Sequence, residues 1–393
     1  MKATREARYV QLGSPWPATI GMPTEHAARF LAAILNQTLR HQLPAGHRFG
    51  RLRALAGRRG VPERTLTGLI ALLPRRARGD LDQLLDRTAA GWQALAARSS
   101  RLPPDPPPLT ALALPRSMGL MVFVFGSAPS PLLVLKVPGG SGADGIDREV
   151  RALTRAEQAR VAPLALGRIG EARVQEGLAG APIPVQPLTP ERARRLGWPE
   201  PFTDLTDALA RLAEVTVRRV PPDDVGASIQ RVLEDRSVEE RSRRLLAAAW
   251  RDLARLDVSV LCHGDPKPQN WLVAGGRLQG IVDWELARSR GTPGFDVWHA
   301  MLDYVEFGVG LVRWSADQRV RCFEAAWTTS RFCTDARRAA RTVARAAGVP
   351  EARLDALELA FFGRRLGRRL LTASADTADA AVAARMLQIA CAS

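Results

Sequence analysis

One stretch of the chain, residues 260–285, constrains the fold and the chemistry more than any other. It reads VLCHGDPKPQNWLVAGGRLQGIVDWE, in which apolar runs alternate with a polar loop and a Gly-Gly turn. Short apolar runs bounded by turn residues are typical of buried β-strands. Asp265 and Asn270 lie in the polar loop, five residues apart, and Asp283 ends the last apolar run. The pattern therefore predicts three oxygen-bearing side chains presented at the ends of short strands.

These three side chains match the needs of phosphoryl transfer. One carboxylate, that of Asp265, can orient a hydroxyl nucleophile. The amide oxygen of Asn270 and the carboxylate of Asp283 can bind Mg²⁺, which neutralises charge on phosphates. Each residue alone has a structural alternative, since Asp265 can cap a turn and Asp283 can simply end a strand. Their order and spacing together favour the functional interpretation.

Lysine is rare in this sequence. Of 56 basic residues only three are lysines, namely Lys2, Lys136 and Lys267, and the other 53 are arginines. Lys136 ends the apolar run LLVLKV. A compact ammonium suits a point contact with a phosphate, whereas the planar fork of arginine needs a different geometry. Lys136 is therefore a candidate nucleotide-binding residue.

The region around Lys136 is expected to form a small antiparallel sheet. Residues 109–114, 119–125 and 131–137 are short, apolar and partly β-branched, and turn-forming residues separate them. This spacing predicts a three-stranded meander. A helix is predicted over residues 144–160, with Asp147 as its N-cap.

The sequence HGDPKPQN at 263–270, followed by VDWE at 282–285, resembles the aminoglycoside phosphotransferase and choline kinase family, which is related to protein kinases. The resemblance covers about residues 109–393. It implies an α+β, protein-kinase-like bilobal fold with a small β-rich N-lobe and a larger helical C-lobe. It also implies an enzyme that uses Mg²⁺ and transfers the γ-phosphate of ATP or GTP to a hydroxyl of a small molecule.

The family pattern suggests roles for individual residues. Asp265 resembles the catalytic base, and Asn270 and Asp283 resemble the Mg²⁺ ligands. Lys136 resembles the strand lysine that binds the α- and β-phosphates. Lys267 lies where some kinase families use a lysine on the transferred phosphate, and the alternative is a solvated loop lysine.

Two further groups of residues follow from the same resemblance. His263 resembles a histidine that braces the catalytic loop, and Asp296 resembles an N-cap or a structural anchor. Glu149 resembles the helix glutamate that pairs with the strand lysine. Glu157 lies on the same predicted helix and is the alternative partner.

The remaining nucleotide contacts are expected in two segments. Residues 174–180 resemble the hinge between the lobes, where backbone groups meet adenine. The loop 115–119 stands where the family covers the phosphates, but it has one glycine and no GxGxxG pattern. The candidate residues in these segments are Gln175, Glu176 and Gly177 in the hinge, and Ser117 and Gly119 in the loop.

The formal net charge of +16 is concentrated in the N-terminal quarter. Residues 1–108 contain 17 Lys/Arg and 7 Asp/Glu, a surplus of ten, and the remainder contains 39 and 33, a surplus of six. The quarter ends in LPPDPPP, a run that cannot form a helix or a central strand. We therefore expect three parts: a basic, mostly helical extension over 1–108, an N-lobe with hinge over 109–180, and a helical C-lobe over 181–393.

The extension is expected to contain helices at residues 25–39 and 81–97, because both segments have apolar residues at helical spacing. Residues 55–69 resemble a helix-turn-helix. Arg59 departs from that pattern, because it occupies the usually buried position before the turn glycine. Chance similarity in an Ala/Arg-rich segment is the simpler explanation, and nucleic-acid binding by the extension is kept as the alternative.

Composition excludes several other classes of protein. Apolar residues make up 46% and charged residues 24% of the chain, as in globular proteins. Four widely spaced cysteines form no disulfide framework and no zinc spacing, so a reducing cytoplasm is the expected location. No signal peptide and no membrane-spanning apolar run are visible. The oligomeric state cannot be inferred.

The acceptor is the least constrained part of the prediction. In this fold the C-lobe helices bind it, here at about residues 201–258 and 293–390, and these helices are rich in arginine. A pocket for a polycationic aminoglycoside should be lined by carboxylates, yet no acidic run is present. A sugar, an amino alcohol or a hydroxyl compound that carries an anion is as consistent with these helices as an antibiotic. The carboxylates available after the metal strand are Asp303, Glu306 and Asp317.

Three alternative functions remain open at this point. One is a kinase-like ligand sensor fused to a nucleic-acid-binding extension. Another is a pseudokinase scaffold, against which the intact set of Lys136, Asp265, Asn270 and Asp283 argues. A protein kinase is disfavoured, because no phosphorylatable activation loop lies between Asp283 and Asp296.

Overall fold

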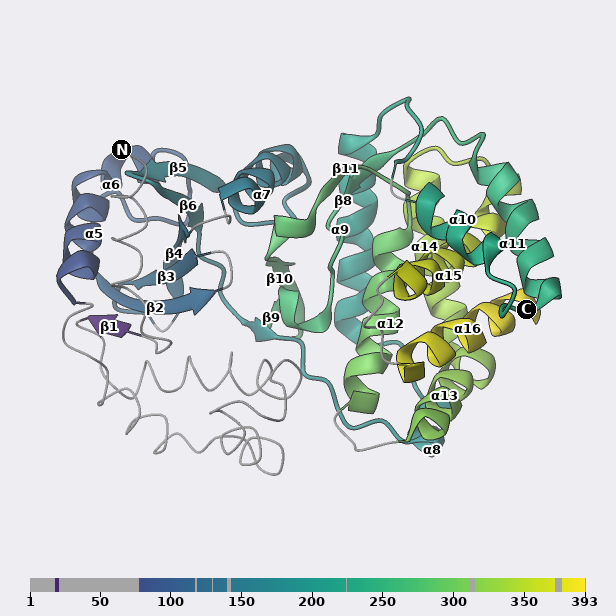
Figure 1. Cartoon of the computed structure of the whole chain (residues 1–393). Coiled ribbons are helices and arrows are strands. Elements are labelled where there is room, and N and C mark those ends of the chain that lie inside the picture. Colours follow the sequence, from purple (N-terminus) through teal and green to yellow (C-terminus); the bar gives the residue numbers. More distant parts are fainter. Residues whose placement is uncertain are drawn as a thin grey trace, which may run out of the picture.

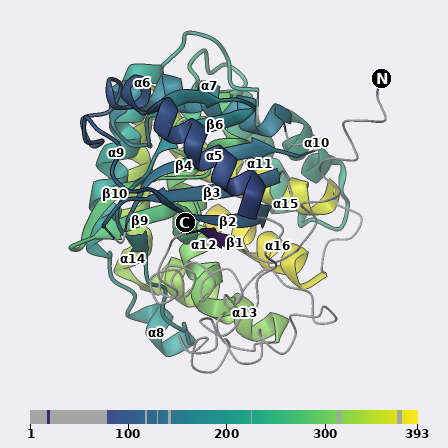
Figure 2. The ribbon, with the colours of Figure 1, turned by 90° about the vertical axis from the view of Figure 1, so that its left-hand side faces the viewer.

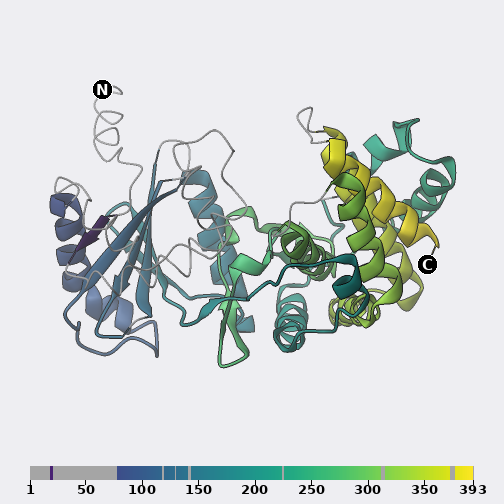
Figure 3. The same ribbon diagram turned by 90° about the horizontal axis from the view of Figure 1, so that it is seen from below.

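The computed structural model describes residues 18–20, 78–116, 119–128, 130–139, 143–223, 225–310, 315–371 and 377–392. They form a small lobe built around one sheet and a larger, mostly helical lobe (Figure 1). The two lobes lie side by side and are joined by extended segments, as the view from below also shows (Figure 3). The predicted bilobal α+β fold is confirmed. Ser117, the expected helix at 25–39 and the helix-turn-helix resemblance at 55–69 lie outside the described residues.

The N-lobe sheet has six antiparallel strands in the order β1-β2-β3-β4-β6-β5. The predicted meander is confirmed as three of these strands, β2, β3 and β4, which pair in sequence order. The strand order of the sheet places Lys136 of β4 in its middle, opposite Met121 of β3 on one side and Arg173 of β6 on the other. The strands are β1 (Ala18–Ile20), β2 (Thr110–Arg116), β3 (Gly119–Phe125), β4 (Pro131–Pro138), β5 (Ala165–Ile169) and β6 (Ala172–Glu176).

One face of this sheet is covered by helices that precede the Pro-rich segment. The predicted helix at 81–97 is present as α5 (Arg78–Ala90) and α6 (Trp92–Ala96), with Gly91 between them. Figure 2 shows α5 lying across the sheet. Trp92 is fully buried in one hydrophobic cluster with Leu135 and Val174 of the sheet. Residues 78–102 are therefore packed on the N-lobe, although the Pro-rich segment separates them from it in sequence.

The other face of the sheet carries α7 (Ala143–Ala156), which begins one residue before the predicted helix. The expected N-cap role of Asp147 is wrong, because this residue lies inside the helix and its carboxylate pairs with Arg173. It ends in the 3₁₀ turn η3 (Glu157–Ala159), and Arg160 follows in a left-handed conformation, with φ of 52°. The buried face of α7 includes Glu149 and Leu153. A buried glutamate on an otherwise apolar face needs a cation partner, and this requirement already points to Lys136.

Short strands connect the lobes and hold the polar loop of residues 263–270. β8 (Val260–Cys262) pairs with β11 (Arg288–Gly291), and β9 (Trp271–Ala274) pairs with both β7 (Ala181–Pro182) and β10 (Arg277–Ile281). The loop is therefore closed at both ends by strand pairing.

The C-lobe is a helical assembly around a core that includes the fully buried side chains of Phe202, Trp271 and Trp327. Among the described residues, no helix is long and apolar enough to cross a membrane. The helices of the C-lobe are α8 (Pro190–Arg194), α9 (Glu200–Thr216), α10 (Gly226–Glu234), α11 (Glu240–Leu253), α12 (Phe295–Gly310), α13 (Ala316–Glu324), the π-helical turn η6 (Ala325–Thr329), α14 (Arg331–Ala346), α15 (Leu354–Leu371) and α16 (Thr377–Ala392).

Candidate active site

The polar loop after β8 is anchored to the first turn of α12. The buried Asp296 carboxylate accepts hydrogen bonds from the backbone N–H groups of His263 (2.5 Å) and Gly264 (3.1 Å). Burial raises the pKa of Asp296, while His263 and these N–H groups act in the opposite direction. Gly264 has φ of 83°, and a Cβ there would lie 2.3 Å from the Leu286 carbonyl oxygen. Only glycine fits this position, which makes the loop path specific.

His263 connects the loop to the strand that ends at Asp283. Its Nδ1 accepts a hydrogen bond from the Asp265 N–H at 3.2 Å, so the ring proton lies on Nε2, which donates to the Val282 carbonyl at 2.9 Å. The ring is fully buried and contacts the Trp284 ring, with 4.6 Å between centroids. Both ring nitrogens are therefore engaged in holding backbone, and the residue acts as a structural brace.

Asp265 and Lys267 form an ion pair at the mouth of the loop. The Lys267 Nζ lies 2.5 Å from Asp265 Oδ2, and the two side chains are 21% and 20% exposed. Burial opposes protonation of Lys267, but Asp265 and Asp283 outweigh it and raise the pKa of the ammonium. Lys267 is thus a permanent cation directly beside the candidate base.

Asn270 and Asp283 offer oxygen ligands of the kind that Mg²⁺ prefers. The Asn270 Nδ2 donates to the Asp265 carbonyl at 2.8 Å, which orients the amide and leaves its oxygen available to a cation. Asp283 has a left-handed backbone, with φ of 70° and ψ of 57°. A non-glycine residue in this region carries strain of the kind often found at functional sites. The donor set therefore fits a magnesium site.

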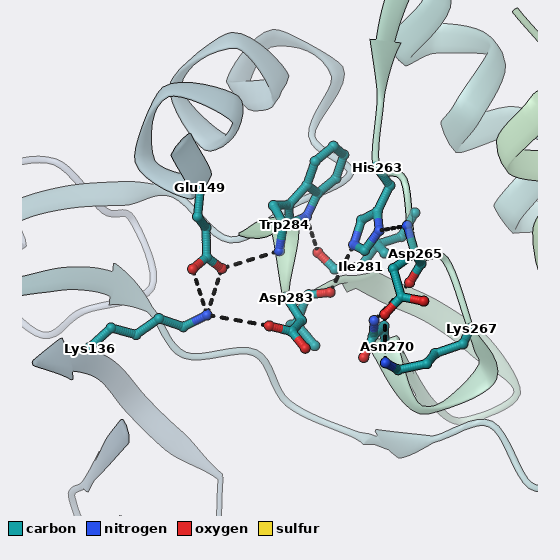
Figure 4. A network of polar contacts seen from close by, with 10 residues as sticks. Lys136, Glu149, His263, Asp265, Lys267, Asn270, Ile281, Asp283 and Trp284 are labelled. Carbon is teal, nitrogen blue, oxygen red and sulfur yellow. Dashed lines mark hydrogen bonds and ion pairs between the residues drawn. The ribbon is translucent and has the colours of Figure 1, made fainter. Parts of the chain in front are cut away.

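Lys136 makes a buried ion pair with Glu149. Its Nζ lies 2.7 Å and 2.6 Å from the two carboxylate oxygens, and 3.8 Å from the Asp283 carboxylate (Figure 4). Glu149 also accepts the backbone N–H of Trp284 at 3.2 Å. The partner of Lys136 is thus Glu149, whereas Glu157 is exposed in η3. The pair joins β4, α7 and the metal strand.

The hinge candidates differ in how they can meet a nucleotide. The N–H groups of Glu176 and Gly177 donate to the Leu164 and Leu132 carbonyls, at 2.9 and 2.7 Å. Any adenine contact here therefore falls to carbonyl groups or to backbone beyond Gly177. Gln175 is buried in β6, between Val134 of β4 and Ala165 of β5.

The Glu176 side chain contacts the segment between α6 and the Pro-rich run. Its buried carboxylate accepts a hydrogen bond from the Ser99 hydroxyl and lies 3.8 Å from the Arg101 guanidinium. No residue of 78–102 had been assigned to the site from the sequence. The contact joins two segments 77 residues apart, so no local pattern could have indicated it.

Gly119, the remaining candidate in the phosphate-covering loop, has a structural role that needs no nucleotide. It begins β3 with φ of 140°, and a Cβ there would lie 2.1 Å from the Val137 carbonyl oxygen. Close approach of β3 and β4 thus requires glycine at this position.

A polar cluster on the C-lobe side of Asp265 completes the site. His299 and Asp303 lie on α12, and an oxygen of Asp303, a ring nitrogen of His299 and an oxygen of Asp265 are all within 4.8 Å of one another. The sequence interpretation had named Asp303 among the available carboxylates but had missed His299. The available signal was spacing, because residues 296, 299 and 303 share one face of a helix.

Similarity to known proteins shows the family of the chain. A profile of the phosphotransferase enzyme family matches residues 122–339, which is more than half of the chain. The chain therefore belongs to this family, as its resemblance implied, and is an enzyme of the phosphotransferase class. No curated protein matches the chain.

Several solved structures are similar at low sequence identity. Aminoglycoside phosphotransferase APH(4)-Ia, in a ternary complex with ADP and hygromycin B, is 18% identical with a TM-score of 0.41, covering 71% of this chain and 92% of that one. A choline/ethanolamine kinase family protein from Mesorhizobium loti is 18% identical with a TM-score of 0.37, covering 79% and 100%. Macrolide 2'-phosphotransferase from Brachybacterium faecium is 17% identical with a TM-score of 0.39, covering 76% and 97%.

Proposed function

We propose that the protein transfers the γ-phosphate of ATP, or of GTP, to a hydroxyl group of a small molecule. The observation that carries this proposal is the convergence of three charged elements on one site (Figure 4). These are the Lys136–Glu149 pair, the strand-end Asp283, and the loop carboxylate of Asp265. Phosphoryl transfer depends mainly on positioning and on electrostatic stabilisation, which this arrangement supplies.

In the proposed mechanism, Asp265 orients the acceptor hydroxyl and accepts its proton as the new bond to the γ-phosphorus forms. The bond from this phosphorus to the β,γ-bridging oxygen breaks, and ADP or GDP leaves. Lys136 holds the nucleotide phosphates, and Glu149 fixes the direction of the ammonium. Lys267 supplies positive charge beside the incoming phosphoryl group. Bound Mg²⁺, held by Asn270 and Asp283, would neutralise charge on the phosphate oxygens.

The hinge is proposed to bind the base of the nucleotide through its backbone. Because the N–H groups of Glu176 and Gly177 are already used, the contacts are expected from carbonyl groups of 175–177 and from the backbone that follows. Gln175 would then border the inner end of the adenine site. The phosphate-covering role of Ser117 and Gly119 remains a proposal of the same kind.

The test is acceptor-dependent release of ADP or GDP in the presence of Mg²⁺, measured for the whole chain with a library of hydroxyl compounds. Asp265→Asn should lower turnover by about 10²- to 10⁴-fold, the usual contribution of a general base. Asp252→Asn, the same change at an exposed position on α11, is the matched control and should keep full activity. Equal turnover in the wild type and Asp265→Asn would contradict the proposal.

The alternative of a ligand sensor with a nucleic-acid-binding extension concerns residues 1–108, of which the structure describes 18–20 and 78–108. Binding of the whole chain to duplex DNA, measured over a range of salt concentrations, would separate the two functions. Phosphotransferase activity without salt-dependent DNA affinity is the result that we expect.

A further inference from the structure

The acceptor side of the site is formed by four polar side chains from two helices. His299, Asp303 and Glu306 lie on α12, and Arg365 lies on α15. All four are largely buried, with side-chain exposures between 10% and 21%. Asp303 and His299 each place a polar atom within 4.8 Å of an Asp265 carboxylate oxygen. We call these four residues the acceptor-side cluster.

Within the cluster every carboxylate has a cation close by. The Arg365 guanidinium lies 3.5 Å from Asp303 and 2.5 Å from Glu306. Asp265 itself is paired with Lys267 at 2.5 Å. Three carboxylates therefore face two fixed cations, before protonation is considered.

Protonation reduces the negative charge further. Burial raises the pKa of Asp303 to about 8; Glu306 and Asp265 act in the same direction, and Arg365 opposes them. Burial also lowers the pKa of His299 well below its usual range, and Arg365 lowers it further. The raised pKa of Asp303 favours its protonated carboxyl, and the lowered pKa of His299 favours the neutral imidazole. The guanidinium groups of Arg364 and Arg368 also act on His299, in addition to the ion pairs of Arg365 and Lys267. The cluster therefore offers no uncompensated negative charge to a cationic ligand.

This charge balance distinguishes between classes of acceptor. An ammonium group of an aminoglycoside would need a carboxylate that is not already compensated, and burying an uncompensated charge is costly. A divalent cation meets the same obstacle. A hydroxyl group does not, because the imidazole and the carboxyl can each donate or accept a hydrogen bond to it.

We propose that His299 and Asp303 bind a second hydroxyl of the acceptor, and that the acceptor is an uncharged sugar or polyol. The reacting hydroxyl lies on Asp265, and a neighbouring hydroxyl of the same molecule contacts His299 and Asp303. The polar atoms of Asp265, His299 and Asp303 lie within 4.8 Å of one another, so two adjacent hydroxyl groups of one small ring can contact them together. Glu306 and Arg365 then act as positioning residues that orient Asp303. The inference rests on the proposed phosphotransferase function.

The first test compares acceptors that differ only in charge. Turnover of the whole chain with ATP and Mg²⁺ is measured for glucose against glucosamine and for galactose against galactosamine. We expect kcat/KM to be higher for the uncharged member of each pair by about tenfold or more. Preference for the amino member overturns the inference but leaves the proposed function intact. A second result would have the same two consequences: nucleotide turnover that depends on Asp265 but is stimulated by neither neutral sugars nor polyols such as inositol.

The second test uses a variant with a matched control. Asp303→Leu keeps the approximate volume of the side chain but removes both its hydrogen-bond donor and its acceptor. It should raise the KM of the sugar about tenfold or more, whereas the KM of ATP should change less than about twofold. Asp252→Leu, the same change at an exposed position on α11, should leave both values as in the wild type. Equal effects on the two KM values would show a merely structural role for Asp303 and would overturn the assignment.

Discussion

The two sides of Asp265 are built in different ways. On the nucleotide side, Lys136, Glu149 and Asp283 come from a strand, a helix and a strand end, and each occupies a recognisable position in the sequence. On the acceptor side, His299, Asp303, Glu306 and Arg365 project from two helices. The first set carries a buried ion pair and a strained backbone, whereas the second set is a nearly balanced network of paired charges.

This difference follows from what each side is proposed to bind. The phosphates of a nucleotide are the same in every turnover and require fixed cations. The acceptor must be distinguished by the pattern of its hydroxyl groups, and helix faces allow that pattern to vary by substitution without changing the backbone. The nucleotide side should therefore control the rate for every acceptor, and the acceptor side should control the choice among them.

The largest expected effect is at Lys136. Lys136→Met leaves the Glu149 carboxylate buried without its cation, which should cost about 3–5 kcal/mol of unfolding free energy and most of the activity. The double variant Lys136→Met/Glu149→Met should recover part of the stability, because both charges are removed, but none of the activity. Denaturant unfolding and nucleotide turnover of both variants measure this. Full recovery of turnover in the double variant would assign the pair a purely structural role.

Asp283→Asn tests whether the nucleotide side acts on all acceptors alike. Loss of this carboxylate should lower turnover on the order of 10²-fold or more, as for other single electrostatic elements. The ratio of kcat/KM values for two different acceptors should stay the same as in the wild type. A ratio that changes with the substitution would show that the two sides are not separable.

The pH dependence of stability should reveal Asp303. Its pKa is raised from 3.8 to about 8 in the fold, so the native state favours the protonated form, and this contribution to stability is lost as the pH rises toward 8. Compared with Asp303→Asn, the wild type should therefore lose unfolding free energy between about pH 4 and pH 8. Denaturant unfolding at pH 5 and pH 8 measures this. A difference between the two proteins that is the same at both pH values would contradict the shift.

The smallest expected effect concerns the contact behind the hinge. Ser99→Ala removes the hydroxyl that donates to Glu176 and should cost about 1.5 kcal/mol of unfolding free energy, as for hydrogen bonds to charged groups. Ser237→Ala, which removes a 2.6 Å bond to Asp235 at an exposed site, should cost less than about 0.5 kcal/mol. Equal costs would show that the contact with the hinge adds nothing beyond a surface interaction.

Much of the nucleotide side could be predicted because its residues stand next to local signals. The three central strands and α7 were expected within two residues of their observed starts. The choice between Glu149 and Glu157 could not be made, because both lie on the predicted helix. Eight residues separate them by roughly 12 Å along a helix axis, so only one can reach the lysine. The end of α7 at Ala156 and its packing on the sheet determine which one does.

The packing of residues 78–102 on the N-lobe also lay beyond prediction. A run of prolines shows that a segment forms neither helix nor central strand, but not whether its flanks lie together. Burial of Trp92 beside Leu135 and Val174 is a long-range apolar contact. The same limit applies to Arg365, which meets Asp303 across 62 positions of sequence.

By itself the sequence determined which side chains stand at strand ends and in the loop. The signals for this are apolar runs that alternate with polar segments, and turns that contain glycine, and both act within a few residues. Asp265, Asn270 and Asp283 follow from that local order. Only the tertiary structure decided the pairings: Lys136 with Glu149, and Arg365 with Asp303 and Glu306. Charges that leave water need partners, and the partners are supplied by whichever elements the hydrophobic cores bring into contact.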